Sequence, residues 1–147
     1  MEGEYSNKKR FIMKQIRLLI LVLFLGGLLA GCQKDNDYTK KVRDIDYTVL
    51  DETKIPKDLK KVINEKKEVG FKLSYVEGEY LYIAIGFGEK DTGGYSVSVN
   101  QLYQTKNGVY FDTTLQGPDG NDVISQTHSY PYLVVKMEYI KGSVVFN

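Results

Sequence analysis

Few side chains in this chain could take part in covalent or metal chemistry: the sequence contains one cysteine, Cys32, and one histidine, His128. A lone histidine in a polar loop, with no cysteine or second histidine near it, is a weak candidate for a metal site or a catalytic triad. The patterns Gly-x-Ser-x-Gly, His-Glu-x-x-His and the glycine-rich phosphate loop do not occur in the sequence. We therefore expect a protein that is not an enzyme and binds no cofactor, with His128 as a surface or hydrogen-bonded loop residue.

The stretch "GPDGND" at 117–122 offers hard oxygen ligands from Asp119, Asn121 and Asp122. A complete Ca²⁺ loop also needs acids at alternating positions and a distal glutamate, and both are missing here. The favoured interpretation is a turn without a metal, because Gly, Pro, Asp and Asn each suit turn conformations. Weak calcium binding is the alternative.

Cys32 ends a segment with three parts. A stretch with five basic residues comes first, an apolar run from Leu18 to Leu29 follows, and the small residues Ala30 and Gly31 come last. This order is typical of a bacterial secretory signal. The apolar run has 12 residues, fewer than the roughly 20 that a helix needs to cross a bilayer. Met13 also opens a typical signal, so translation from Met1 or from Met13 fits the pattern.

The sequence "LAGC" at 29–32 resembles the bacterial lipobox, in which the cysteine thiol is diacylated and the cysteine becomes the new N-terminus. We expect residues 1–31 to be a lipoprotein signal peptide and Cys32 to carry palmitate-type acyl chains. The protein is then extracytoplasmic and lipid-anchored to the cell membrane. The alternative is an ordinary signal peptide or a single-span anchor with an incidental cysteine.

The charge balance excludes one class of partner. Residues 1–31 hold five of the 20 basic and two of the 19 acidic residues, so 15 basic and 17 acidic residues remain, a formal net charge of −2. A near-neutral domain of this kind is not typical of nucleic-acid binding. The remaining length allows one domain, which we place at residues 43–147 after a polar tether at 32–42.

This domain is expected to be mostly β. The sequence has twelve tyrosines, six phenylalanines and no tryptophan, and tyrosine favours strands as β-branched residues do. One short helix is predicted with Pro56 in its first turn, and Gly70 ends that segment. Its apolar face consists of Ile55, Leu59, Val62 and Ile63.

Strand signals occupy the remainder. A first strand is expected over 43–50. The stretch "EYLYIAIGF" at 79–87 has apolar residues at both odd and even positions, which is typical of a central strand covered on each face. Lys106-Asn107-Gly108 predicts a hairpin with a type I′ turn. The predicted fold class is α+β, mostly β: an antiparallel two-layer sheet or sandwich of six or seven strands with one short helix.

The paired glycines Gly93 and Gly94 precede a predicted strand directly. Such a pair permits a positive φ angle or a close approach of two backbones. The favoured interpretation is a bulge or a corner between sheet layers. A loop that binds a ligand or a partner is the alternative.

Three short stretches carry a family resemblance: "TGGYSVSV", "LQGPDG" and "SYPYLVVK". Together they resemble the C-terminal domain of the PrcB family, lipoprotein-type subunits of bacterial surface protease complexes. The resemblance implies an accessory subunit that binds and stabilises a partner serine protease, and it supplies no catalytic residues.

We therefore expect a membrane-anchored, non-catalytic binding module, with a secreted serine protease or another envelope protein as its partner. A lipoprotein that binds a small molecule or a cell-wall ligand at the glycine pair is the alternative. The partner-binding candidates are two short runs of residues: Gly93, Gly94 and Tyr95, and Tyr130, Pro131 and Tyr132. Tyr110 is a further candidate, since exposed tyrosines often anchor partners.

The lipid anchor can be tested at the N-terminus of the mature protein. Mass spectrometry of protein isolated from membranes should find Cys32 as the first residue, carrying a diacylglyceryl group. An unprocessed N-terminus without lipid would contradict the lipobox interpretation.

Overall fold

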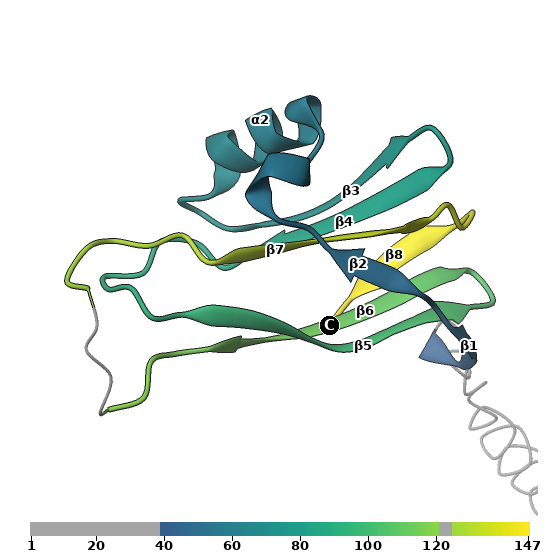
Figure 1. Ribbon diagram of the computed structural model, residues 1–147. Coiled ribbons are helices and arrows are strands. Elements are labelled where there is room, and N and C mark those ends of the chain that lie inside the picture. The colour runs from purple at the N-terminus through teal and green to yellow at the C-terminus, as the bar shows by residue number, and fades with distance from the viewer. Residues whose placement is uncertain (1–38, 121–124) are drawn as a thin grey trace, which may run out of the picture. The chain divides into compact units, whose positions relative to one another are not determined.

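The computed structural model describes residues 39–120 and 125–147, which form two β-sheets and one α-helix (Figure 1). The expected signal segment, Cys32 and most of the expected tether lie outside these residues. The elements are β1 (Lys41–Asp44), β2 (Tyr47–Val49), the 3₁₀ helix η3 (Glu52–Lys54), α2 (Lys57–Lys66), β3 (Phe71–Glu77), β4 (Tyr80–Gly86), β5 (Ser96–Thr105), β6 (Gly108–Gln116), β7 (Tyr132–Glu138) and β8 (Ser143–Phe146). Strand β1 thus begins at Lys41, so that it includes the last two residues of the expected tether.

The strands form two four-stranded sheets that stack face to face (Figure 1). One sheet has the order β1-β5-β6-β8 and the other the order β2-β7-β4-β3. The strand pairs are antiparallel except for β6 and β8, which run parallel. The predicted fold class, α+β and mostly β with antiparallel sheets and one short helix, is confirmed.

The N-terminal segment crosses from one sheet to the other. Residues 43–50, expected as a single strand, fall into β1, which pairs with β5, and β2, which pairs with β7. Between the two strands Ile45 turns into the space between the sheets and is only 8% exposed. The described residues therefore contain eight strands rather than six or seven, because side-chain alternation does not reveal that a chain changes sheets.

The central strand β4 is buried on both faces, as predicted. Leu81, Ile83 and Ile85 belong to the core between the two sheets, whereas Tyr82 and Ala84 belong to the core beneath α2. Each large apolar side chain buried in this way contributes roughly 1.5–3 kcal/mol to folding. Strand β4 thus holds the three layers of the domain together.

Helix α2 covers the outer face of the β2-β7-β4-β3 sheet (Figure 1). Its buried residues, Leu59 and Ile63, pack with Val134 and Ala84 of the sheet. The helix ends as predicted at a glycine: Gly70 has a φ angle of +83°, and its N–H donates to the Lys66 carbonyl oxygen at 3.1 Å. The helix predicted from the apolar spacing is confirmed.

The hairpin between β5 and β6 is confirmed, but its turn differs from the prediction. Thr105 pairs with Gly108, so Lys106 and Asn107 are the two loop residues. Neither has a positive φ angle, and the type I′ prediction is wrong. Gly108, with φ +147°, instead begins β6 at a point where the backbone of Ser143 in β8 passes very close. The glycine serves this close approach rather than the turn.

We expect Gly108→Ala to destabilise the domain by about 3 kcal/mol, because the new Cβ would overlap the backbone of Ser143. Gly78→Ala, in the β3–β4 turn, is the matched control. Its φ angle is +59° and no atom lies within 4 Å of the added Cβ, so it should cost only about 1 kcal/mol. Equilibrium unfolding in urea measures both, and equal losses would show that the approach of β8 is not a constraint.

Candidate functional site

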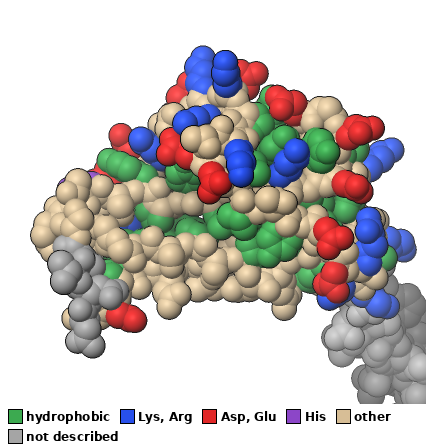
Figure 2. Space-filling view, viewed as in Figure 1, with side chains coloured by type: hydrophobic (Ala, Val, Ile, Leu, Met, Phe, Trp, Pro, Cys, Tyr) green, Lys and Arg blue, Asp and Glu red, His purple; other side chains and the backbone are tan. Residues whose placement is uncertain are grey.

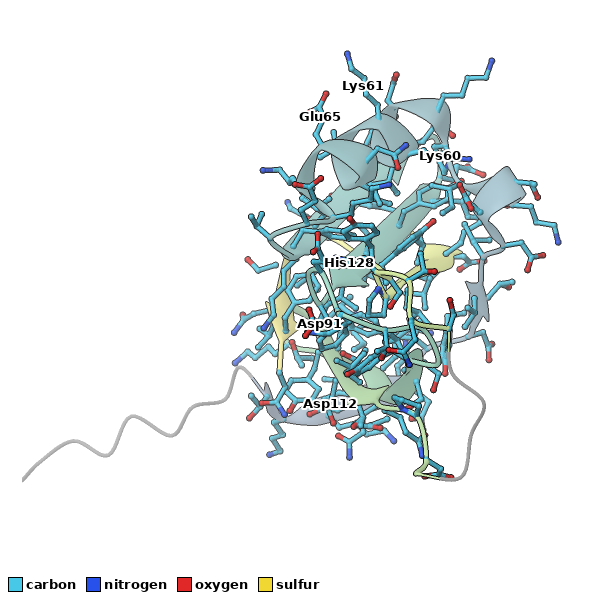
Figure 3. All side chains as sticks on the ribbon, turned by 90° about the vertical axis from the view of Figure 1, so that its left-hand side faces the viewer. Lys60, Lys61, Glu65, Asp91, Asp112 and His128 are labelled. Atoms are coloured by element: carbon cyan, nitrogen blue, oxygen red, sulfur yellow. The ribbon has the colours of Figure 1, made fainter. Side chains whose placement is uncertain are left out.

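Two segments that are far apart in the sequence form one end of the domain: residues 87–95 and residues 125–131. Lys90 and Ser129 exchange two backbone hydrogen bonds, each 2.9 Å long. The Ser129 hydroxyl also donates to the Thr92 carbonyl oxygen at 2.6 Å. We call these two segments the loop end; Figure 3 looks at the domain from this side, with His128 and Asp91 labelled.

A carboxylate connects the side chains of the loop end. One oxygen of Glu89 accepts a hydrogen bond from Nδ1 of His128, and the other accepts one from the Tyr130 hydroxyl at 3.0 Å. The Nζ atom of Lys67 lies 5.0 Å from the centroid of the Tyr130 ring, within the range of a cation–π interaction. The side chains of His128 and Glu89 are 59% and 38% exposed, so the cluster is open to a partner.

The hydrogen bonds of this cluster change how its members titrate. Those from His128 and Tyr130 lower the pKa of Glu89, because they stabilise the carboxylate form. The bond to Glu89 raises the pKa of Tyr130, because a phenolate would lose its role as donor to the carboxylate. At neutral pH Glu89 is therefore ionised and Tyr130 is a neutral hydroxyl donor.

The structure brings five of the six predicted partner-binding residues to the loop end. These are Gly93, Gly94, Tyr95, Tyr130 and Pro131.

The sixth, Tyr132, begins β7 and packs beneath α2. The centroid of its ring lies 6.3 Å from that of Phe71, and burial raises its pKa. Tyr110 lies elsewhere again, because its ring stacks on Tyr103 at 4.7 Å between centroids. Both rings are held by aromatic packing.

The glycine pair forms a corner that is packed against the second segment of the loop end. Gly94 has a φ angle of +85°, and the Gly93 N–H donates to the Ser125 carbonyl oxygen at 2.9 Å. A Cβ on Gly93 would lie 3.3 Å from the Ser125 Cβ, tighter than an ordinary contact. The interpretation as a structural corner, with one positive φ angle and one close approach, fits this geometry.

The sequence reasoning missed Glu89 and Lys67. Glu89 precedes the glycine pair in "GEKDTGG", but its partners His128 and Tyr130 lie 39 and 41 residues further along the chain. No spacing in the sequence signals such a contact, because the pairing of the two loop segments creates it.

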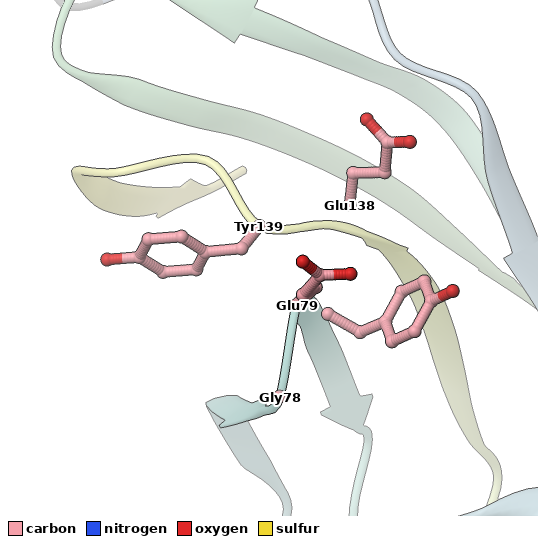
Figure 4. A pocket seen from close by; sticks show the side chains of 5 residues that line it. Gly78, Glu79, Glu138 and Tyr139 are labelled. Atoms are coloured by element: carbon pink, nitrogen blue, oxygen red, sulfur yellow. The ribbon is translucent and has the colours of Figure 1, made fainter.

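At another end of the domain a surface hollow of about 520 Å³ is lined by Gly78, Glu79, Tyr80, Glu138 and Tyr139 (Figure 4). A neighbouring hollow of about 280 Å³ shares Tyr80 and Glu138 and adds Lys136, whose Nζ lies 3.6 Å from the centroid of the Tyr80 ring. Neither hollow is lined by the glycine pair.

The described residues contain no group of three or more His, Cys, Asp or Glu side chains that could hold a metal ion. The calcium alternative cannot be placed as a whole, since Asn121 and Asp122 lie outside the described residues. Among the described residues, no helix has the length and apolar character needed to cross a bilayer.

Residues 81–138 match the family model described as PrcB C-terminal. The resemblance to the PrcB family is thereby confirmed. This PrcB segment runs from the second residue of β4 to the last residue of β7 and includes both segments of the loop end. It relates the chain to a family of protease-complex subunits. No curated protein and no solved structure matches the chain.

The lowered pKa of Glu89 predicts a loss of stability in acid. A carboxyl group whose pKa is lower in the folded state stabilises that state above its unfolded pKa, about 4.3 for glutamate, and this contribution is lost as the pH falls through the folded value. Tyr130→Phe removes one of the two hydrogen bonds, so it should raise the pKa of Glu89 and reduce the acid-induced loss of stability.

Carbon-detected NMR titration of the Glu89 carboxyl group measures its pKa. Urea unfolding at several pH values between 6 and 3 measures the loss of stability in acid. Tyr139→Phe is the control, because Tyr139 is 51% exposed and lies in the 520 Å³ hollow rather than in the loop end. An unchanged pKa of Glu89 in Tyr130→Phe would show that the hydrogen bond does not form in solution.

Proposed function

We propose that this protein is a membrane-anchored surface lipoprotein that acts as a non-catalytic binding module. Its role is that of an accessory or stabilising subunit of an extracellular protease complex. The observation that carries the proposal is the match of residues 81–138 to the PrcB C-terminal family. The matched segment includes the central strands of both sheets and the whole loop end. The family likeness thus covers both the framework and the exposed cluster.

The sequence before the domain supports anchoring at a membrane. An acylated Cys32 would be separated from β1 by residues 33–40, eight residues. At about 3.5 Å per residue, that segment spans no more than roughly 28 Å. A domain on such a short tether meets mainly proteins that are themselves at the membrane surface, as expected of a subunit in a surface complex.

The loop end supports contact with a protein rather than catalysis. Its histidine is bonded to a carboxylate, but a hydrolase of the Ser-His type also needs a nucleophile within hydrogen-bond reach of the ring. In the part of the chain that the structure describes, no hydroxyl is bonded to His128. Tyrosine is enriched among the residues that anchor a partner, and Tyr130 is the tyrosine of this exposed cluster.

The alternative, a small molecule or cell-wall ligand bound at the glycine pair, has less support. Gly93 is occupied by its hydrogen bond to Ser125 and by the close packing of that residue. A ligand at this corner would first have to displace the second segment of the loop end.

Affinity purification of the tagged full-length protein from solubilised membranes tests the proposal. We expect a secreted serine protease or another envelope protein to co-purify. His128→Ala should lower its recovery about fivefold or more, as loss of a contact residue does. Cys32→Ser should release the protein from the membrane fraction.

Glu65→Ala is the matched control, because Glu65 is exposed on α2, away from His128 in Figure 3. It should leave the recovery unchanged. If purification of the wild-type protein repeatedly yields no protein partner, the proposed function is wrong.

A further inference from the structure

Strand β5 is covered by a neighbour along only part of one edge. It runs over ten residues, Ser96–Thr105, and pairs with β6 along its length. On the other side β1 pairs only with Tyr103, Gln104 and Thr105. Among the described residues, no strand lies beside residues 96–102 on that side. We call residues 96–102 the open edge.

The open edge has only one of the usual protections against strand pairing, a bulge. Its sequence, "SVSVNQL", contains no charged residue and no proline. Natural edge strands are commonly protected by charges, by proline or by being very short. Strand β3, at the edge of the other sheet, has such protection, since it contains the charged residues Lys72 and Glu77. The open edge has a single irregularity, a bulge at Asn100.

A surface hollow of about 350 Å³ accompanies the open edge at the point where β1 leaves β5. Its lining is mixed: Ile45, Leu102, Tyr47 and Tyr103 lie beside the charged Lys41 and Asp44 and the amides Asn100 and Gln101. Further along, Val97 and Val99 are only partly buried against the core between the sheets. Figure 2 views this side of the domain, and hydrophobic side chains are visible between the two layers. The middle of the lower layer there is free of charged side chains.

The chain's own β1, with the charged sequence "KVRD", shows how a strand pairs with this edge and not which side chains the edge selects. It pairs antiparallel with the end of β5, and the next residue, Ile45, enters the core between the sheets. A further extended segment that continues β1 along β5 would form the same backbone hydrogen bonds and could place an apolar side chain beside Val97 and Val99. The established pairing of β1 and β5 would thus be extended toward the loop end.

We propose that the open edge binds an extended segment of the protein partner as an additional strand of the β1-β5-β6-β8 sheet. This inference rests on the proposed function, because it requires a protein partner. The segment is about five residues long and uncharged, with apolar side chains toward Val97 and Val99 and polar ones beside Ser96 and Ser98. Backbone hydrogen bonds supply the affinity in such pairing, and the pockets beneath alternate side chains supply the specificity.

A second copy of this chain can use less of the open edge than a strand from another protein. The bulge between Val99 and Gln101 adds one residue to β5 relative to β6. A symmetric antiparallel pair of two β5 strands avoids the bulge only if it is confined to residues 96–99, and a longer pair would contain two bulges in one short stretch. A regular strand from another protein meets a single bulge along residues 96–102.

Photo-crosslinking of the full-length protein in its membranes tests the inference. Ser98→p-benzoylphenylalanine places the probe on the open edge, and Ser74→p-benzoylphenylalanine is the matched control on the exposed β3. We expect irradiation to join the partner at position 98 and not at position 74. Mass spectrometry of the product should map the crosslink to an uncharged, alternating segment.

A synthetic peptide of the mapped segment gives a second readout. Hydrogen exchange of the amides in residues 96–102 should slow when the peptide binds. Only alternate peptide residues direct their N–H groups to β5, so N-methylation of one alternate set should weaken binding about tenfold or more, and methylation of the other set much less.

Three results would overturn the inference. They are a crosslinked product consisting of two copies of this chain, equal loss of binding for both methylated peptides, and a co-purified partner that crosslinks at position 74 but not at 98. In each of these cases the proposed function can still stand. If no partner is recovered by purification and none is crosslinked, the proposed function fails and the inference fails with it.

Discussion

Burial of β4 on both faces is the constraint on which the rest of the domain depends. Ile83 and Ala84 are neighbours on opposite faces of the strand, and each is 0% exposed. An apolar strand of this kind needs cover on both sides, and α2 supplies one cover and the β1-β5-β6-β8 sheet the other. The three layers follow from this requirement. Among the described residues no helix covers the outer face of the second sheet, and there Asn100 donates to Thr114 at 2.8 Å, a contact suited to water-exposed surface.

The way in which the N-terminal segment covers the core determines which edges stay open. A single long strand over 43–50 would have protected one sheet edge fully. The chain instead changes sheets at Ile45, so that β1 protects part of β5 and β2 part of β7. Two short strands close the core near Ile45, but no strand in the part of the chain that the structure describes pairs with the outer edge of residues 96–102. Ile45 is therefore buried between the sheets, and the backbone edge of β5 next to it stays unpaired among the described strands.

The open edge follows the first segment of the loop end along the chain, because β5 begins directly after Tyr95. The loop end is fixed by backbone pairing between Lys90 and Ser129, and Glu89 holds His128 and Tyr130 above that pair. The side chains of this cluster are therefore held in place before any partner binds. Preorganised groups lose less conformational entropy on binding than mobile ones.

The sequence by itself determined the features that depend on neighbouring residues. The spacing of Leu59 and Ile63 predicted the helix. The apolar residues at both odd and even positions of 79–87 predicted a central strand. Three short motifs predicted the PrcB resemblance. These signals are local, since they arise from the periodicity of a single element or from a short run of residues. The hairpin was also predicted, but its turn type was not, because Gly108 is needed where β8 approaches rather than within the turn.

Only the tertiary structure decided the change of sheets at Ile45, the separation of Tyr132 from the loop end and the contact of Glu89 with His128. Each of these depends on which distant segments come together. The alternation of a strand shows which side chains share a face, but not which sheet the strand joins. A carboxylate and its partners 39 and 41 residues away are brought together only by the pairing of two loops. Local side-chain patterns predict which residues are buried. Contacts between residues far apart in the sequence are determined by how the layers pack together.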